Sequence, residues 1–232
     1  CVGVSLELDC SPWLDGKYKY TLKITRSVIK NGKREQIAKV ILQRVLASIG
    51  SDISYNSFAS DTGIGSHNTV YDYLSFLEDA FIMAQIYHYD YNQKKINFRK
   101  NKKIYLTDPF LFWLLDWWLN GNPNSYNELA KNQILKSRLA ENLVFLHLKS
   151  LFKDIFFFKD KREIDFICKN AAWECKYQNK VSLDDFKPLL NFPGKRFIIT
   201  KNDFKITNDY QLIPIELFLL LKKEYFNLGY SE

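Results

Sequence analysis

The stretch REIDFICKNAAWECKYQ, residues 162–178, alternates apolar and charged side chains in two runs around a polar turn. Alternation with a period of two is typical of β-strands, so the stretch predicts a hairpin. Residues two apart in a strand share a face, so Glu174 and Lys176 project together. A turn over residues 169–172 would place Asp165 opposite Lys176. It would also make Asp165 the diagonal neighbour of Glu174, roughly 7–8 Å away at the backbone.

Two interpretations of this charged face are open. A divalent cation fits between Asp165 and Glu174, and carboxylate oxygens without histidine or thiolate favour Mg²⁺ or Mn²⁺. Such a cation can activate a water and neutralise a phosphodiester, while Lys176 positions that water or stabilises developing negative charge. Glu141 lies on the apolar stripe of a predicted helix, where an unpaired carboxylate is costly, so it is a candidate third ligand. The alternative is an ordinary solvated strand face with salt bridges.

The hairpin belongs to a longer run of predicted elements in the C-terminal half of the chain. Their order is helix, three strands, helix, strand, helix. In residue ranges they are a helix at about 126–152, strands near 154–160, 163–168 and 172–178, a helix near 182–191, a strand at 196–200 and a helix near 214–226.

The preceding residues predict a winged helix, which is three helices followed by a two-stranded ribbon. Residues 34–50 have a helical period that ends at Gly50. Residues 54–81 contain a short helix, a glycine-containing turn and a second helix capped by Ser66, which is helix-turn-helix spacing. The strands at 81–91 and 102–108 then flank the basic segment 92–103, which we expect to form the wing.

The expected wing carries six cations within ten residues, and the whole chain has a net charge of +7. Both features favour a polyanionic partner, with the wing gripping DNA phosphates and the second helix contacting bases or phosphates. The alternative is a solvated loop beside core tyrosines, and winged helices also mediate protein contacts. The candidate DNA-binding residues are His67, Asn68, Thr69, Lys94, Lys95, Arg99, Lys100, Lys102 and Lys103.

The predicted domain plan has four parts. Residues 1–33 are expected to be a remnant of an upstream region, 34–107 the winged helix, 108–125 a buried helix with a linker, and 126–232 the second domain. The chain begins with Cys and has a single Met, so we expect a fragment of a longer protein. The apolar run at 109–120 is too short to span a bilayer. No CxxC pair is present, which argues against a zinc knuckle. Cys168 and Cys175 fall on the apolar side of the hairpin, which suits a reducing cytoplasm, and no signal peptide is visible, so we expect a cytoplasmic protein without membrane partners.

The second domain resembles the PD-(D/E)XK nuclease superfamily through Glu141, Asp165 and the triplet Glu174-Cys175-Lys176. The wider chain, roughly residues 20–200, is similar to the C-terminal half of archaeal and bacterial AAA-type ATPases that carry a winged helix and a nuclease-like domain. The matching phrases are SYNSFASDTGIGSHNTVYDYLSFLEDAF, KKIYLTDPF, LAENLVFLHL and EIDFICKNAAWECKY. The ATPase loop GxxxxGK(S/T) is not in this sequence, so this piece should not hydrolyse ATP.

The resemblance implies metal binding by Asp165 and Glu174, support from Glu141, and assistance to the attacking water by Lys176. The expected fold is therefore α/β (α+β), with a winged helix-turn-helix followed by a restriction-endonuclease-like αβββαβ domain. The expected function is Mg²⁺- or Mn²⁺-dependent DNA hydrolysis by an endonuclease that forms the C-terminal part of an ATPase. The alternative is a catalytically inactive DNA-binding or protein-interaction module of that ATPase. Expected partners are DNA and an upstream ATPase domain of the same protein, and an oligomer is compatible with the sequence.

Overall fold

The computed structural model describes residues 30, 32–90, 93–121, 131–160, 163–226 and 228. They form a mixed α/β structure with one nine-stranded sheet of order β1-β3-β2-β4-β5-β6-β7-β9-β8. The strands are β1 Asp52–Ile53, β2 Met83–Asp90, β3 Lys95–Leu106, β4 Phe156–Lys159, β5 Glu163–Cys168, β6 Ala171–Lys176, β7 Lys195–Thr200, β8 Lys205–Ile206 and β9 Gln211–Pro214. The α-helices among these residues are α2 Glu35–Ser48, α3 Tyr55–Thr62, α4 His67–Asp79, α5 Pro109–Asn120, α7 Gln133–Leu151 and α8 Ile215–Phe218.

The three N-terminal helices agree with the helical periods of the sequence. α3 ends at Gly63, whose φ of 68° is in the left-handed region that favours glycine. Ser66 caps α4 because its side chain accepts a hydrogen bond from the Asn68 backbone N–H. The predicted stripe of α4, which includes Val70 and Leu74, is fully buried. The helix-turn-helix spacing therefore corresponds to two helices joined by a four-residue turn.

The ribbon that follows α4 differs from its prediction. We expected residues 92–103 to form a wing between two strands, but β3 already begins at Lys95 and runs to Leu106. Its first half pairs with the end of β2, so most of the basic segment is strand. Lys94 has a φ of 47° and lies in the short connection, which leaves few residues for a loop.

The C-terminal part contains the three predicted strands after α7, but both later helix predictions were wrong. Residues 182–191 form two short 3₁₀ helices, Leu183–Phe186 and Leu189–Asn191, since Pro188 between them has no N–H to continue a helix. The expected helix at 214–226 is one turn, α8, followed by a 3₁₀ turn at Lys223–Phe226. The small antiparallel pair β8–β9 was not predicted. Most of the expected remnant at 1–33 and most of the expected linker lie outside the described residues.

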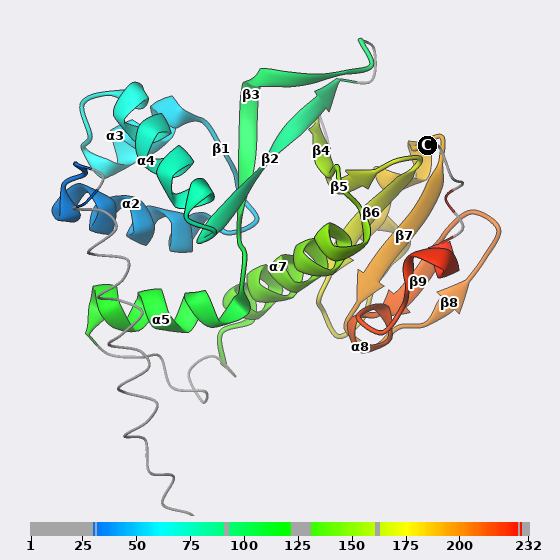
Figure 1. Ribbon diagram of the computed structural model, residues 1–232. Coiled ribbons are helices and arrows are strands. Elements are labelled where there is room, and N and C mark those ends of the chain that lie inside the picture. Colours follow the sequence, from blue (N-terminus) through cyan, green and yellow to red (C-terminus); the bar gives the residue numbers. More distant parts are fainter. Residues whose placement is uncertain are drawn as a thin grey trace, which may run out of the picture.

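The sheet is continuous across the boundary that the sequence suggested between two domains. β2 pairs in parallel with β4 through Tyr87 and Phe156, and through His88 and Phe157. In Figure 1, α2, α3 and α4 lie together on one side of the long β2–β3 ribbon, while α7 runs beside the strands β4 to β7. The largest hydrophobic core includes residues of both parts, among them Leu106, Phe145 and Trp173. This continuity brings β3 close to the β5–β6 hairpin.

Candidate functional site

The register of the β5–β6 hairpin brings Asp165 and Glu174 closer than the sequence suggested. Phe166 pairs with Trp173 and Ile167 with Ala172, so the turn has two residues and the expected turn over 169–172 was wrong. The tight turn is possible because Lys169 takes a left-handed conformation with a φ of 53°. As a result the Asp165 backbone N–H points at Glu174 Oε2, with a distance of 3.4 Å between nitrogen and oxygen.

Both hairpin carboxylates are buried, because the sheet, α7 and β3 enclose this end of the hairpin. Asp165 is 7% exposed and Glu174 is 6% exposed. The interpretation of this face as solvated is therefore wrong. Burying a carboxylate is costly unless it is ionically paired and hydrogen-bonded, so the partners of these groups decide what the site can do.

Lys103 is the central partner of the buried acids. Its ammonium Nζ lies 2.6 Å from Glu163 Oε1, 2.9 Å from Asp165 Oδ1 and 3.2 Å from Glu141 Oε1. The side chain is only 1% exposed. The expectation that Lys103 lies among the surface cations of a wing is wrong, because this half of β3 crosses the interior.

Three further hydrogen bonds hold oxygens of the cluster. Asp165 Oδ2 accepts a hydrogen bond from the Cys175 N–H at 3.0 Å, and Glu174 Oε1 accepts one from Lys176 Nζ at 2.6 Å. Tyr105 donates its hydroxyl to Glu141 Oε1 at 2.7 Å. We call Glu141, Asp165, Glu174, Lys103 and Lys176 the carboxylate cluster. The four catalytic candidates from the sequence do converge, but around an ammonium group from β3.

Gly50 closes the cluster on the side of α2. Its φ of 75° is left-handed, and a Cβ added there would lie 2.9 Å from Glu141 Oε2. A side chain at this position would therefore push on the carboxylate as well as strain the backbone. The sequence indicated Gly50 only as the end of a helix.

Burial and neighbouring charges shift the pKa values within the cluster. Burial raises the pKa of Glu174 to about 8, and the negative charge of Asp165 adds to the shift while Lys176 opposes it. Burial likewise raises the pKa of Glu141 to about 7 against the opposing charge of Lys103. For Asp165 burial acts in the same direction, but Lys103 and Lys176 outweigh it and lower its pKa. Asp165 is thus the acid that stays ionised, and its main counterion is Lys103.

The expected metal can be tested against this arrangement. Carboxylate oxygens are suitable ligands for Mg²⁺ or Mn²⁺. However, the Lys103 ammonium lies between Asp165 and Glu141, where a cation shared by these acids would have to bind. Within the described ranges, no three or more His, Cys, Asp or Glu side chains are grouped so that they could hold a metal ion. As they lie, Asp165 and Glu141 do not fit a shared divalent cation, because the ammonium already bridges them.

The candidate DNA-binding residues divide into exposed and buried sets. His67 and Asn68 are exposed at the start of α4, and Thr69 is half-buried. Lys102 is buried, so its placement on a surface wing was wrong as well; its Nζ donates to the Phe98 carbonyl at 2.8 Å. The exposed cations of the hairpin are Lys94, Lys95, Arg99 and Lys100.

Aromatic contacts join the exposed face of α4 to the basic half of β3. Tyr71, which is 51% exposed, lies one turn after His67 and packs edge-on against Tyr55 at 5.7 Å between ring centroids. Lys102 Nζ lies 4.4 Å from the Tyr55 ring centroid, and Phe98 beyond it is 62% exposed. We call the exposed residues of the first turns of α4 and of the basic half of β3 the α4–β3 surface. Its residues are His67, Asn68, Tyr71, Phe98, Arg99 and Lys100.

Sequence reasoning missed four residues of these two sites: Lys103 as a buried ion partner, Tyr105, Glu163 and Tyr71. A signal for Lys103 existed, since it directly precedes the apolar run Ile104-Tyr105-Leu106 in a predicted strand. Tyr71 lies four residues after His67, on the same helical face, and could have been added on that ground.

Comparisons with known proteins give two matches. A family model described as Domain of unknown function (DUF8612) matches residues 23–140, just over half of the chain. The chain is also similar to Uncharacterized protein MJ1544 of Methanocaldococcus jannaschii, with 28% identity over 165 residues, or 67% of this chain. That match covers 32% of the relative, so the chain spans about a third of the length of the curated protein it matches. No solved structure gives a significant match. Over the described part of the chain, none of the helices has the length and apolarity needed to cross a bilayer.

Proposed function

We propose a DNA-binding role without DNA cleavage for this chain, which belongs to the family described as Domain of unknown function (DUF8612). The observation that carries the proposal is the α4–β3 surface, where exposed residues of a helix and of a basic strand are joined by aromatic contacts. In this proposal α2, α3, α4 and the β2–β3 ribbon act as a winged helix, and the part that contains α7 and β4 to β7 has a nuclease-like fold.

The chemistry of the α4–β3 surface suits a nucleic acid. Arg99 and Lys100 can contact phosphates, and His67 and Asn68 project from the first turn of a helix, where base or phosphate contacts are made in helix-turn-helix proteins. A chain with a net charge of +7 also attracts polyanions at long range.

The absence of cleavage in this proposal rests on Lys103. Its ammonium is paired with both Asp165 and Glu141 at contact distance, so a metal ion would have to displace a buried and multiply paired cation. We propose that the carboxylate cluster serves as an internal ion network, which ties β3 to α7 and to the β5–β6 hairpin. The nuclease-like fold would then be kept for its shape.

We further propose that the chain works as part of a longer ATPase. The resemblance to the C-terminal half of AAA-type ATPases supports this, and the relative from Methanocaldococcus jannaschii is about three times as long as the matched region. A DNA-binding region without its own nucleotide loop would position the ATPase on its substrate.

Salt-dependent binding to duplex DNA tests the proposal. We expect the parent protein to bind duplex DNA with an affinity that falls steeply as salt rises. The logarithm of the affinity falls with the logarithm of the salt concentration, and each phosphate contact contributes about 0.9 to the steepness of that fall on duplex DNA. Arg99→Ser with Lys100→Ser should therefore reduce the steepness by about 2. Lys205→Ser, at an exposed lysine on β8, is the matched control and should leave the slope unchanged.

The proposal fails if the parent protein does not bind duplex DNA even at low salt. That result would favour a protein-interaction role for the winged helix. It also fails if Arg99→Ser with Lys100→Ser binds as tightly as Lys205→Ser.

DNA hydrolysis is the second candidate function, and the convergence of Glu141, Asp165, Glu174 and Lys176 favours it. The test is incubation with plasmid, linear and branched DNA in the presence of Mg²⁺ or Mn²⁺. Hydrolysis requires that the parent protein cleaves and that Asp165→Ala and Lys176→Ala do not. If the parent protein is inactive, or if both variants cleave equally well, this candidate is excluded.

A further inference from the structure

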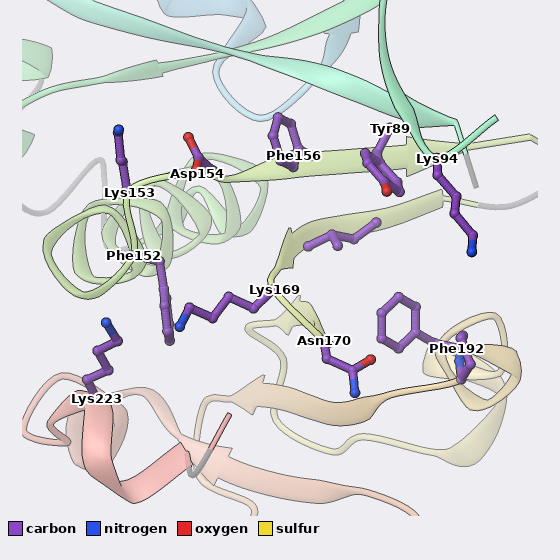
Figure 2. A pocket seen from close by; sticks show the side chains of 12 residues that line it. Tyr89, Lys94, Phe152, Lys153, Asp154, Phe156, Lys169, Asn170, Phe192 and Lys223 are labelled. Carbon is purple, nitrogen blue, oxygen red and sulfur yellow. The ribbon is translucent and has the colours of Figure 1, made fainter. Parts of the chain in front are cut away.

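A cavity of about 800 Å³ opens at the turn end of the β5–β6 hairpin (Figure 2). It lies away from the carboxylate cluster, since the turn residue Lys169 is four residues beyond Asp165, or about 13 Å along the strand. None of the residues that line it belongs to the α4–β3 surface. The cavity is therefore a separate feature of the molecule.

Lysines from four segments that are distant in the sequence line this cavity. Lys94 comes from the β2–β3 connection, Lys153 follows α7, Lys169 is in the hairpin turn and Lys223 begins the last 3₁₀ helix. The lining includes one acid, Asp154. Gathering like charges raises the local positive potential and attracts anions.

The side chains differ in direction, and two of the lysines, Lys169 and Lys223, are placed to share a phosphate. In Figure 2, Lys169 and Lys223 extend toward Phe152, and Lys94 descends from the opposite wall. Lys223 Nζ lies 5.9 Å from the centroid of the Phe152 ring. Lys153 points away from Phe152 in this view. The sequence had grouped Lys94 with the wing, whereas its side chain belongs to this cavity.

Aromatic rings supply the other half of the lining. Tyr89 and Phe156 are half-buried, with ring centroids 5.6 Å apart and planes tilted by 33°. Phe152 and Phe192 form further apolar walls. Small-molecule sites commonly have volumes of about 300–1,000 Å³ and combine apolar walls with a few polar groups. The cavity is therefore large enough for a base, a sugar and a phosphate together.

We propose that this cavity binds one nucleotide unit, with its phosphate between Lys169 and Lys223 and its base against Tyr89 and Phe156. Lys94, at the opposite wall, can contact the next phosphate when the unit belongs to a strand. The same chemistry is available from a free mononucleotide and from the end of a single-stranded nucleic acid. The inference goes beyond duplex binding at the α4–β3 surface and does not depend on it.

Binding of three probes tests the proposal: AMP, a short single-stranded oligonucleotide and inorganic phosphate, each measured by calorimetry at low salt. The variant combines Lys94→Gln, Lys169→Gln and Lys223→Gln, all at exposed positions, and circular dichroism checks that it folds. We expect at least a tenfold loss of AMP affinity. If the oligonucleotide binds here, its salt slope should fall by about 2, at about 0.7 for each phosphate contact on single strands. Lys205→Gln is the matched control and should bind as the parent does.

The outcomes distinguish a free nucleotide from a strand end as the ligand. They also distinguish the cavity proposal from the proposal for the α4–β3 surface. Tighter binding of the oligonucleotide than of AMP identifies a strand end, and equal binding identifies a free nucleotide; both support the site. If the parent protein binds neither AMP nor the oligonucleotide, the proposed site is overturned. It is also overturned if the triple variant binds AMP as tightly as the parent does. Inorganic phosphate binding as tightly as AMP overturns the base contact. Arg99→Ser with Lys100→Ser should retain AMP binding, so loss of duplex binding alone counts only against the α4–β3 surface.

Discussion

The two halves of β3 place the same residue type in opposite surroundings. Lys100 belongs to the exposed half, at the α4–β3 surface, whereas Lys103, three residues later, is fully buried among three carboxylates. In the sequence both belong to one basic run. An exposed lysine keeps its hydration and is free to meet a ligand, while a buried one loses hydration and must be compensated by fixed acids. A run of like charges can therefore serve two separate purposes within one strand.

The largest expected effect is at Lys103. We expect Lys103→Met to lower the free energy of unfolding by about 3–5 kcal/mol, because it leaves Asp165 and its neighbours buried without their counterion. Urea denaturation at neutral pH measures this loss. A loss below about 1 kcal/mol would contradict the description of Lys103 as the centre of the ion network.

A cation should restore part of that loss if Lys103 takes the place of a metal. We expect added Mn²⁺ to raise the melting temperature of Lys103→Met and to leave that of the parent protein unchanged, because ligand binding to the native state stabilises it. Equal stabilisation of both proteins would instead support a metal site beside Lys103, and with it the hydrolytic candidate.

The pH dependence of stability should come from the cluster. Because the native state raises the pKa of Glu174 from 4.5 to about 8, the unfolded chain releases this proton first as the pH rises. Stability should therefore be greatest near pH 4.5 and fall toward pH 8, by up to about 1.4 kcal/mol per pH unit for each such group. Glu141, with a pKa of about 7, adds to the fall below pH 7. Glu174→Gln should flatten the curve between pH 7 and 8, and an unchanged slope in that variant would count against this assignment.

A smaller effect is expected at the hydrogen bond that supports Glu141. Tyr105→Phe removes the donor at 2.7 Å from Glu141 Oε1 and keeps the ring that stacks on Phe145. We expect a loss of about 1–2 kcal/mol in the free energy of unfolding, measured by urea denaturation. Because the packing is retained, a loss as large as that of Lys103→Met would mean that the ring position changes as well.

The smallest effect is expected at Lys100. Lys100→Met changes an exposed residue without a described ion pair, so we expect a change within about 0.5 kcal/mol, by the same measurement used for Lys103→Met. It is the matched control for Lys103→Met because both remove one lysine from β3. If the two variants lose similar stability, burial is not what distinguishes the two halves of the strand.

Local patterns account for the parts of the fold that the sequence predicted. The helical period of residues 34–50 and the cap at Ser66 correspond to α2 and α4, and the alternation in EIDFIC corresponds to β5. The prediction of a helix at 214–226 was wrong. β9 ends at Pro214, and only one helical turn, α8, follows it, because an apolar run by itself does not specify a long helix. The hairpin register was two residues off, since alternation alone does not choose between a two-residue and a four-residue turn.

The candidate site shows the same limit. Glu141, Asp165, Glu174 and Lys176 were found because strand and helix periodicities align side chains over two to four residues. Tyr105 and Lys103 were not, because their partners lie in other segments: Lys103 and Asp165 are 62 positions apart. A short-range sequence pattern does not indicate which charged residue of a distant segment packs beside a buried carboxylate.

The sequence by itself determined the helices α2 to α5, the hairpin and the set of acids and lysines available for chemistry. Only the tertiary structure decided that Asp165 and Glu174 are buried and that Lys103 is their counterion. It also decided that Lys94 faces a cavity rather than the α4–β3 surface. The physical reason is that periodicity depends on the geometry of the local backbone, whereas burial depends on which distant segments pack above a side chain. The cost of burying a charge then selects its partner.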